Sequence, residues 1–325
     1  MSYTITQESF DSLADCWCDP NQHLRWDCLF VLPVWLKVWW QEFGGGAKLY
    51  LGAVRQGEKI IGIAPLMLRD GTASFLGGVD VCDYLDFVVT PGTEVDFFSV
   101  LLDDLRQNGI TYLDLGHLRP EATVLTHLVA IAQNRGYEVL SQPADVSVEL
   151  DLPATWEEYL AILTTKQRHE VNRKLRRLAE AGKVDYHFVE DSAAVPEVMD
   201  TFLKMFTESR EDKATFLTTR MESFLRALAN ALAKARMLKL GILKLDELPV
   251  AIIMCFDYND CIYLYNSGYD PHNSLSAGLL SKVLGIKTSI QEGKKKFDLL
   301  KGDESYKYHL GGRGIPLYRC QITMK

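Results

Sequence analysis

"LYLGAVRQGEKIIGIAPLML" (49–68) returns in modified form as "LKLGILKLDELPVAIIMCFD" (238–257). Both segments alternate apolar and other residues, pass a polar turn and end in an apolar run, which is typical of two antiparallel strands joined by a short turn. A third apolar segment follows each copy, "TASFLGG" after the first and "CIYLYNSG" after the second. The aligned identities are Leu49/Leu238, Leu51/Leu240, Gly52/Gly241, Glu58/Glu247 and Ile63/Ile252.

The match resumes further along, where "QNGITYLDLG" (107–116) aligns with "QEGKKKFDLL" (291–300). Each segment is typical of a helix end, a capping glycine and a strand. Two matches in the same order predict a duplicated α/β unit with mixed, mostly antiparallel twisted sheets flanked by helices. We place the boundary near residue 150, giving units 1–150 and 151–325, and expect Pro153 in the first turn of the next helix.

Bulk composition excludes some functions. The chain has 325 residues, enough for about two domains with a large core. A net charge of −8 argues against an overall electrostatic footprint for nucleic acid or anionic membrane. The apolar stretch "CLFVLPVWLKVWW" is short and interrupted, and no signal peptide is evident, so we expect neither a membrane span nor export. Seven cysteines without regular spacing are more typical of a protein in the reducing cytoplasm than of a disulfide framework. The segment "CWC" (16–18) matches no standard zinc pattern, so we expect no metal site.

Positive charge is concentrated in "TTKQRHEVNRKLRRLAEAG" (164–182). The pattern predicts an amphipathic helix capped by Thr164 or Thr165 and stopped by Gly182. Its apolar face holds Val171, Leu175 and Leu178, and its opposite face holds Lys166, Glu170, Arg173 and Arg177. This cationic face is either a solvated surface or a phosphate contact, and the pattern leaves both interpretations open.

A loop and helix follow the aromatic-rich strand "CIYLYN". The turn residues "SGYDPHNS" precede a helix that we expect to start near Ser274 or Ser276 and to run to Gly293. Small residues in its first turn, "SLSAGLL", leave the backbone amides open to an anion. A well-capped helix without a ligand explains the same spacing equally well.

Lys307 lies in "KGDESYKYHLGG" (301–312), just after the short buried strand expected in "KKKFDLL". Burying a lysine without a partner costs several kcal/mol. We therefore expect its amine either to reach water or to meet an anion.

Taken in order, these motifs resemble a known family. "VWLKVWWQEFGGG", "LYLGAV", "IIGIAPLML" and "DYLDFVVTPG" resemble the N-terminal half of the cellulose-biosynthesis-protein-like (CelD-type) acyltransferases. "KQRHEVNRKLRRL", "YNSGYDPHNSLSAGLL" and "FDLLKGDESYKYHLGG" resemble their C-terminal half. That family belongs to the GNAT superfamily of N-acyltransferases and is similar to the FemABX transferases, which place two GNAT units in one chain. The resemblance runs from about Phe30 to Leu310.

The resemblance implies a tandem GNAT-like enzyme that transfers an acyl group from acyl-CoA to an amine. The second unit would bind the donor and carry the chemistry, and the first, degenerate unit would shape the acceptor cleft. The strand Ile262–Asn266 and the following helix start would bind the pantetheine and pyrophosphate. The implied donor-binding residues are Tyr265, Asn266, Ser276, Ala277, Gly278 and Leu279, with Arg168 and Arg173 of the basic helix as possible phosphate contacts.

The resemblance also implies roles in catalysis. Lys307, which follows an aromatic residue near the end of the second unit, would stabilise the reacting oxyanion or a donor phosphate. Asp303 and Glu304 are candidates for accepting the amine proton, and Tyr306 or Tyr269 for donating to the leaving group. For each of these except Lys307, the sequence alone favours a simpler interpretation, a solvated turn or an aromatic wall residue.

One departure from the family pattern widens the choice of donor. The usual acetyl-CoA loop has Gln or Arg followed by two glycine positions, whereas "HNSLSA" has His272 and Leu275 at two of those places. A FemABX-like transferase using aminoacyl-tRNA is therefore an alternative, although the net negative charge speaks against tRNA. A non-catalytic GNAT-like binding module is a second alternative. The acceptor expected by analogy is a small molecule or a cell-envelope precursor with an amine.

Overall fold

The computed structural model describes residues 2–78 and 80–324. The described residues fall into two compact units: Ser147–Gly314 forms one, and the segments before and after it form the other. The chain thus leaves the first unit within β7 (Glu138–Asp151) and returns to it along β13 (Arg313–Thr323). The assignment of acceptor and donor roles to residues 1–150 and 151–325 stays a prediction.

The first unit contains most of the N-terminal half of the chain. Pro33 occupies the first turn of α2, where its missing N–H leaves no gap in the helix. In chain order its elements are β1 (Tyr3–Gln7), α1 (Phe10–Cys18), η1 (Leu29–Val31), α2 (Pro33–Phe43), β2 (Lys48–Gln56), β3 (Lys59–Arg69), β4 (Thr72–Phe75), β5 (Val88–Val89), α3 (Glu94–Gln107), β6 (Tyr112–Leu118), the π-helical turn η2 (Val124–Leu128) and α4 (Val129–Asn134).

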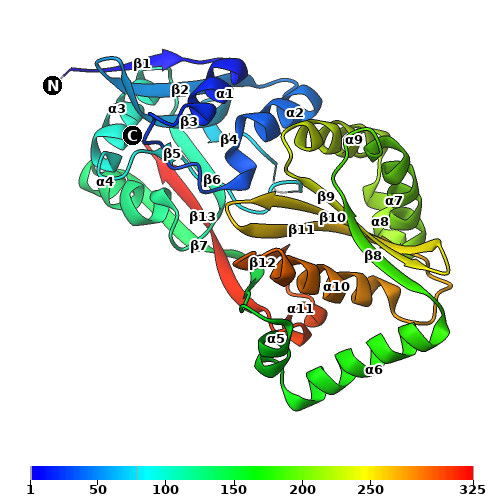
Figure 1. Ribbon diagram of the computed structural model, residues 1–325. Helices are drawn as coiled ribbons and strands as arrows, with labels where there is room; N and C mark the ends of the chain where they lie inside the picture. Colours follow the sequence, from blue (N-terminus) through cyan, green and yellow to red (C-terminus); the bar gives the residue numbers. More distant parts are fainter. Residues whose placement is uncertain (1, 79, 325) are drawn as a thin grey trace. The chain divides into compact units, whose positions relative to one another are not determined.

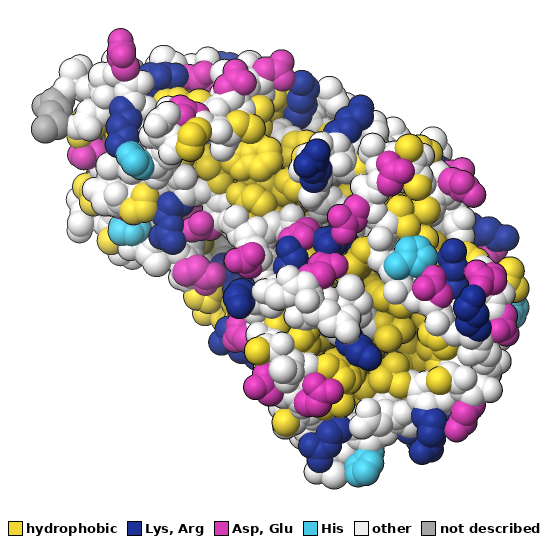
Figure 2. All heavy atoms as spheres, viewed as in Figure 1, with side chains coloured by type: hydrophobic (Ala, Val, Ile, Leu, Met, Phe, Trp, Pro, Cys, Tyr) yellow, Lys and Arg dark blue, Asp and Glu magenta, His cyan; other side chains and the backbone are white. Residues whose placement is uncertain are grey.

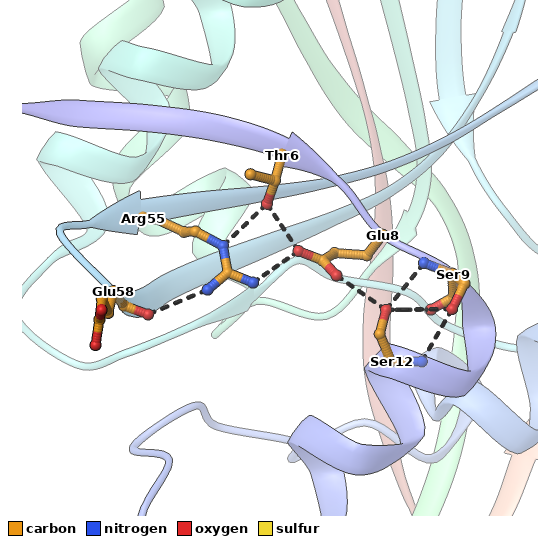
Figure 3. Close-up of polar contacts among 6 residues, drawn as sticks. All are labelled: Thr6, Glu8, Ser9, Ser12, Arg55 and Glu58. Atoms are coloured by element: carbon orange, nitrogen blue, oxygen red, sulfur yellow. Dashed lines mark hydrogen bonds and ion pairs between the residues drawn. The ribbon is translucent and has the colours of Figure 1, made fainter.

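The strands of the first unit follow the order β1-β2-β3-β4-β6-β13, with β5 beside β3. All of these neighbours are antiparallel except β4 and β6, which run parallel. At the β1 edge, Arg55 bonds the carboxylate of Glu8 (2.8 Å) and the hydroxyl of Thr6 (3.0 Å), and Glu8 also accepts from Ser12 of α1 (Figure 3). This network joins β2 to the short edge strand and to the helix after it.

The second unit contains the basic helix and the candidate site. Its first helix begins at Trp156, because Thr155 and Glu158 form a capping box there. The expectation that Pro153 lies in the first turn is therefore wrong. The elements are α5 (Trp156–Ile162), α6 (Thr165–Ala181), β8 (Val184–Val189), α7 (Val195–Ser209), α8 (Glu211–Phe216), α9 (Thr219–Lys234), β9 (Leu238–Leu245), β10 (Leu248–Tyr258), β11 (Cys261–Tyr269), α10 (Ala277–Gln291), β12 (Lys296–Lys301) and α11 (Ser305–His309).

The strands of this unit follow the order β7-β12-β11-β10-β9-β8, with only the β11–β12 pair parallel. The helices α7 and α9 pack on one face of the sheet and α10 packs on the other (Figure 1). Buried aromatic side chains fill the core, among them Phe202, Phe206, Phe224 and Phe256. The fold class predicted from the sequence, tandem mixed α/β units with mostly antiparallel sheets, is confirmed.

The two units repeat one arrangement. The hairpin β2–β3 corresponds to β9–β10, and the parallel pair β4–β6 corresponds to β11–β12. The helices α3 and α10 end at capping glycines with a positive φ, 77° at Gly109 and 74° at Gly293. Glycine adopts this conformation without strain, and both helix ends close with the same backbone bonds. Both matches that predicted the duplication therefore join equivalent parts of the structure.

The parallel strands β11 and β12 separate before either of them ends. Their pairing stops at Tyr263 and Asp298, although β11 continues to Tyr269 and β12 to Lys301. On its other side β11 stays paired with β10, and a bulge there leaves Tyr265 as the extra residue. Beyond the separation, the polar backbone groups on one edge of β11 are no longer used by β12.

Candidate functional site

The helix α10 begins close in sequence to the free end of β11. Its N-cap residue Ser276 has a left-handed backbone (φ 61°), and its hydroxyl does not cap the helix. Leu279 and Leu280 donate their amides to the Ser276 carbonyl, whereas the amides of Ala277 and Gly278 have no acceptor among the described residues. The helix therefore starts with two free N–H groups, which is the arrangement that binds anions.

Tyr269 fixes the position of this helix start. A Cβ atom on Gly278 would lie 2.5 Å from Cδ1 of the Tyr269 ring, so only glycine fits there. The ring at the end of β11 thus rests on the first turn of α10. This places the two free amides beside the end of β11. The implied donor-binding role of Ser276, Ala277, Gly278 and Leu279 stays a prediction. The hydroxyl of Tyr269 is not engaged in any hydrogen bond that the described residues supply.

The basic helix α6 reaches the start of α10 through one lysine. Lys174 donates to the Ser276 hydroxyl at 2.6 Å and lies 3.4 Å from the carboxylate of Glu170. Arg173 binds the same carboxylate through two nitrogens, at 2.9 and 2.7 Å, and lowers the pKa of Glu170 to about 2. Arg168 makes no side-chain hydrogen bond to any described residue. Sequence analysis named Arg168 and Arg173 but missed Lys174, whose amine lies nearest to the helix start.

The apolar side of α6 packs as the pattern predicted. Val171 and Leu178 are buried, and Leu175 is partly buried against the same cluster. The helix ends at Ala181, as expected, but Gly182 is extended and closely approached by Asp246 instead of forming a left-handed cap. Figure 2 shows apolar side chains gathered in a hollow in the region of α6 and α10. The hydrophobic cluster against which Leu175 packs has six buried members: Leu178, Leu243, Val250, Ala251, Ala277 and Leu280.

Lys307 is buried, and its amine is surrounded by oxygen atoms. Only 2% of the residue is exposed. The amine donates to the carbonyls of Leu300 (2.9 Å), Lys301 (2.6 Å) and Gly302 (3.1 Å), and it pairs with the carboxylate of Glu304 at 3.0 Å. An ammonium group has three N–H donors, so these contacts use all of them. Lys307 thus meets oxygen within its own unit, and its predicted contact with an oxyanion or a donor phosphate stays a prediction.

The other residues predicted for catalysis surround this loop. Asp303 is exposed and accepts a hydrogen bond from the hydroxyl of Tyr308. Glu304 is half exposed and pairs with Lys307. Burial is the main cause that raises the pKa of Tyr306, so the phenol stays protonated and remains able to donate. The structure pairs Glu304 with Lys307 and places the Tyr306 ring near the amine of Lys282, but it does not test which residue accepts a proton.

Comparison with known proteins identifies the second unit. Residues 165–308 match the family model described as an acetyltransferase (GNAT) domain. This chain contains a GNAT domain. The match spans α6 to α11 and therefore includes the start of α10, the end of β11 and Lys307. No curated protein matches this sequence.

Solved structures extend the likeness beyond the GNAT domain. FemX is 10% identical with a TM-score of 0.64, over 98% of this chain and 96% of that chain. A conserved protein of unknown function from Bacteroides thetaiotaomicron is 12% identical with a TM-score of 0.62, over 99% and 100%. The C-terminal domain of a putative lysylphosphatidylglycerol synthetase from Agrobacterium fabrum is 12% identical with a TM-score of 0.54, over 86% and 84%. The predicted relation to GNAT proteins is thereby confirmed for residues 165–308, and the fold resembles that of FemX, whereas the CelD-like branch stays a prediction.

Two lysines of the GNAT domain were missed by sequence analysis. Lys282 of α10 donates to the Ser267 hydroxyl (3.0 Å) and to the Gly278 carbonyl (2.6 Å). Lys213 of α8 donates to the Ser267 carbonyl. Burial, and then the charge of Lys213, lowers the pKa of Lys282 to about 7, and burial lowers the pKa of Lys213 to about 8. A lone lysine in the apolar run "AGLLSKVLGI" was a usable signal for Lys282, but nothing in "EDKATF" marks Lys213.

Membrane-spanning helices and metal-binding clusters are both absent from the described residues. No helix within 2–78 and 80–324 is long and apolar enough to cross a membrane. In the same residues, no three His, Cys, Asp or Glu side chains are grouped so as to hold a metal ion.

Proposed function

We propose that the chain is an N-acyltransferase that moves an acyl group from acyl-CoA to an amine acceptor by direct attack. The observation that carries this proposal is the pair of free amides at Ala277 and Gly278, beside the end of β11, which has already left β12 at Tyr263. Phosphate oxygens suit such a helix start, and Lys174 adds a cation at the same place. The unpaired edge of β11 beyond Tyr263 offers backbone groups to the amide-containing pantetheine arm.

Direct attack needs no nucleophilic side chain. The amine nitrogen bonds to the acyl carbon, the carbonyl oxygen becomes a tetrahedral oxyanion, and the bond to sulfur breaks. Tyr306 keeps its proton and is our candidate for donation to the leaving thiolate. Lys307 would take part directly only if one of its three carbonyl bonds opened. In the closed geometry it positions the loop that carries Glu304 and Tyr306.

Aminoacyl-tRNA is the second candidate donor. The loop "HNSLSA" lacks the usual glycine at Leu275, and the fold resembles FemX over nearly the whole chain. The exposed cations of α6 would then contact the RNA backbone, with Arg177 and Lys166 on the open face. We propose a small-molecule or cell-envelope-precursor amine as acceptor in either case, and the cytoplasm as the site of action.

Ligand-induced thermal stabilisation tests the donor. Acetyl-CoA at 100 times its Kd would add about 2.7 kcal/mol to the free energy of unfolding, which is about 5–10 °C for a unit of this size. Acetyl-pantetheine, which lacks the nucleotide and its phosphates, would stabilise less. Charged tRNA is the third probe. If none of the three raises the melting temperature, the transferase proposal fails and a binding module for another ligand becomes the better hypothesis.

A matched pair of variants locates the donor site. Lys174→Ala removes the cation beside the α10 start, whereas Lys166→Ala removes an exposed lysine from the same helix. We expect Lys174→Ala to weaken acetyl-CoA binding about 10-fold or more and to reduce its salt dependence, since a charged hydrogen bond contributes about 1.5 kcal/mol or more. Lys166→Ala should bind like the wild type. Equal affinities for the two variants would place the phosphates elsewhere.

A further inference from the structure

The amine of Lys282 is buried in surroundings that fit its neutral form. The residue is 7% exposed and lies in the second turn of α10. Its two hydrogen-bond acceptors are the Ser267 hydroxyl and the Gly278 carbonyl, and its nitrogen lies 5.3 Å from the ring centre of Tyr306. A neutral amine has two N–H donors and one lone pair, whereas an ammonium has three donors. Two acceptors therefore satisfy the neutral amine and leave its lone pair free.

A second lysine meets the same residue. Lys213 donates to the Ser267 carbonyl while Lys282 holds the Ser267 hydroxyl, so the two amines approach one residue from α8 and α10. Two ammonium charges this close repel each other strongly where water is excluded. The titratable groups that face Lys282 are Lys213 from α8, Cys255 from β10, and Glu304, Tyr306 and Lys307 from the α11 segment.

The Tyr306 ring offers the amine a cation–π contact, but the charged neighbours do not compensate a second positive charge. Glu304 is the one carboxylate among the groups that act on Lys282, and it already pairs with Lys307. Cys255 is buried, and burial raises the pKa of its thiol, so it carries no negative charge near neutrality. The one negative charge, that of Glu304, is thus shared between its partner Lys307 and the amines of Lys213 and Lys282. Of the last two, Lys282 is the amine whose protonation the surroundings favour less.

Lys282 also lies next to the proposed place of reaction. Ser267 is on the part of β11 that has left β12, and Gly278 belongs to the turn proposed to hold the donor phosphates. Its amine therefore lies between the free strand edge and the helix start. A reacting carbonyl carried along that edge would pass close to this amine, with the Tyr306 ring next to it.

We propose that Lys282 is the proton acceptor of the acyl transfer, an inference that rests on the proposed function. When the acceptor nitrogen bonds to the acyl carbon, its surplus proton passes to the lone pair of Lys282 Nζ. The bond between the acyl carbon and sulfur then breaks with its electron pair on sulfur. Tyr306 donates its proton to that thiolate and recovers one from the ammonium of Lys282, so that amide and free thiol form without another reactant.

The rate profile against pH tests this role. Thiol release from acetyl-CoA would be followed with whichever amine of a panel of amino sugars, amino acids and polyamines gives turnover. We expect kcat/KM to fall below about pH 7, where Lys282 becomes protonated. Lys282→Met and Lys282→Arg should both lose about 100- to 10,000-fold in rate, because neither side chain accepts the proton. Wild-type activity in Lys282→Arg would overturn the proposal.

Two variants of neighbouring residues should shift, in opposite directions, the pH below which kcat/KM falls, which we call the acidic limb of the profile. Lys213→Met removes a charge that lowers the pKa of Lys282, so the limb should move to higher pH. Glu304→Gln removes a charge that raises this pKa, so the limb should move to lower pH. A lysine with only a structural role would not produce opposite shifts. A limb that stays in place in both variants would overturn the proposal.

Nuclear magnetic resonance separates this inference from the proposed function. Lysine labelled with ¹³C at Cε reports the titration of each amine, and Lys282→Met assigns the resonance without any substrate. Titration near pH 7 supports the proposal, and titration near the ordinary lysine value of about 10.4 overturns it. A protein that binds acetyl-CoA but titrates at the ordinary value loses this inference alone. A protein that binds no donor loses the proposed function, and the transfer step falls with it.

Discussion

Replacing Lys307 with methionine should destabilise the second unit. Methionine fills much of the same space but cannot donate, so the carbonyls of Leu300, Lys301 and Gly302 lose their shared partner. Leu300 has a left-handed backbone (φ 61°), a conformation that costs about 1–2 kcal/mol and that these bonds help to hold. The loop between β12 and α11 should therefore relax.

The magnitude follows from the contacts. The bond to Leu300 is fully buried, and a hydrogen bond from a charged donor contributes about 1.5–3 kcal/mol. The other two carbonyls and the half-exposed Glu304 regain water, so each adds less. We expect a total loss of about 2–4 kcal/mol, or about 5–12 °C in melting temperature for a unit of this size.

Urea unfolding followed by circular dichroism measures this loss. Lys295→Met is the control, because Lys295 is an exposed lysine on the turn before β12. The control should unfold at the wild-type midpoint. If Lys307→Met is as stable as the control yet has lost its activity, the amine acts on substrate and the positioning role inferred from its contacts is refuted.

Three further predictions concern the same unit. Gly278→Ala should weaken acetyl-CoA binding in calorimetry, because the new Cβ pushes the Tyr269 ring away from the helix start; unchanged affinity would contradict this. The free energy of unfolding should rise between pH 7 and 10.5, because the lowered pKa of Lys282 lets the unfolded chain bind more protons than the folded chain there. Urea titrations at pH 7 and 9 measure this rise, and an equal rise in Lys282→Met would refute the explanation. Tyr159→Phe should lose about 1 kcal/mol, since its buried hydroxyl donates to the Leu310 carbonyl at 2.9 Å; an unchanged urea midpoint would argue otherwise.

The fold was accessible from the sequence because its signals are local and occur twice. The turn residues, the alternation of the hairpins and the capping glycines Gly109 and Gly293 act within a few residues of each other. The start of the helix after Pro153 was misplaced because the capping box of Thr155 and Glu158 gives the helix a stronger N-terminus three residues later. Pro153 and the Thr155–Glu158 pair are both acceptable helix starts, and the helix begins after Thr155, where side chains bond the free backbone N–H groups.

The site was only partly accessible, because burial of a charge depends on residues far away in the sequence. A helix start near Ser274 or Ser276 was predicted, since small residues and a preceding turn are visible in order, and the structure has Ser276 as the N-cap. The lysine that approaches it, Lys174, is separated from Ser276 by about a hundred residues and is one of many cations in α6. Which of them faces α10 depends on how the helix packs, and amphipathic periodicity alone does not settle this.

Lys307 and Lys282 show why residue type alone does not assign a role. Lys307 attracted attention as an isolated lysine after a buried strand, and the structure surrounds it with four oxygen atoms. Such a shell occupies every N–H donor of the amine. Lys282 drew no attention within its apolar helix, yet it has only two acceptors and a cation, Lys213, nearby. The number of oxygen atoms around each amine therefore favours a positioning role for Lys307 and proton transfer for Lys282.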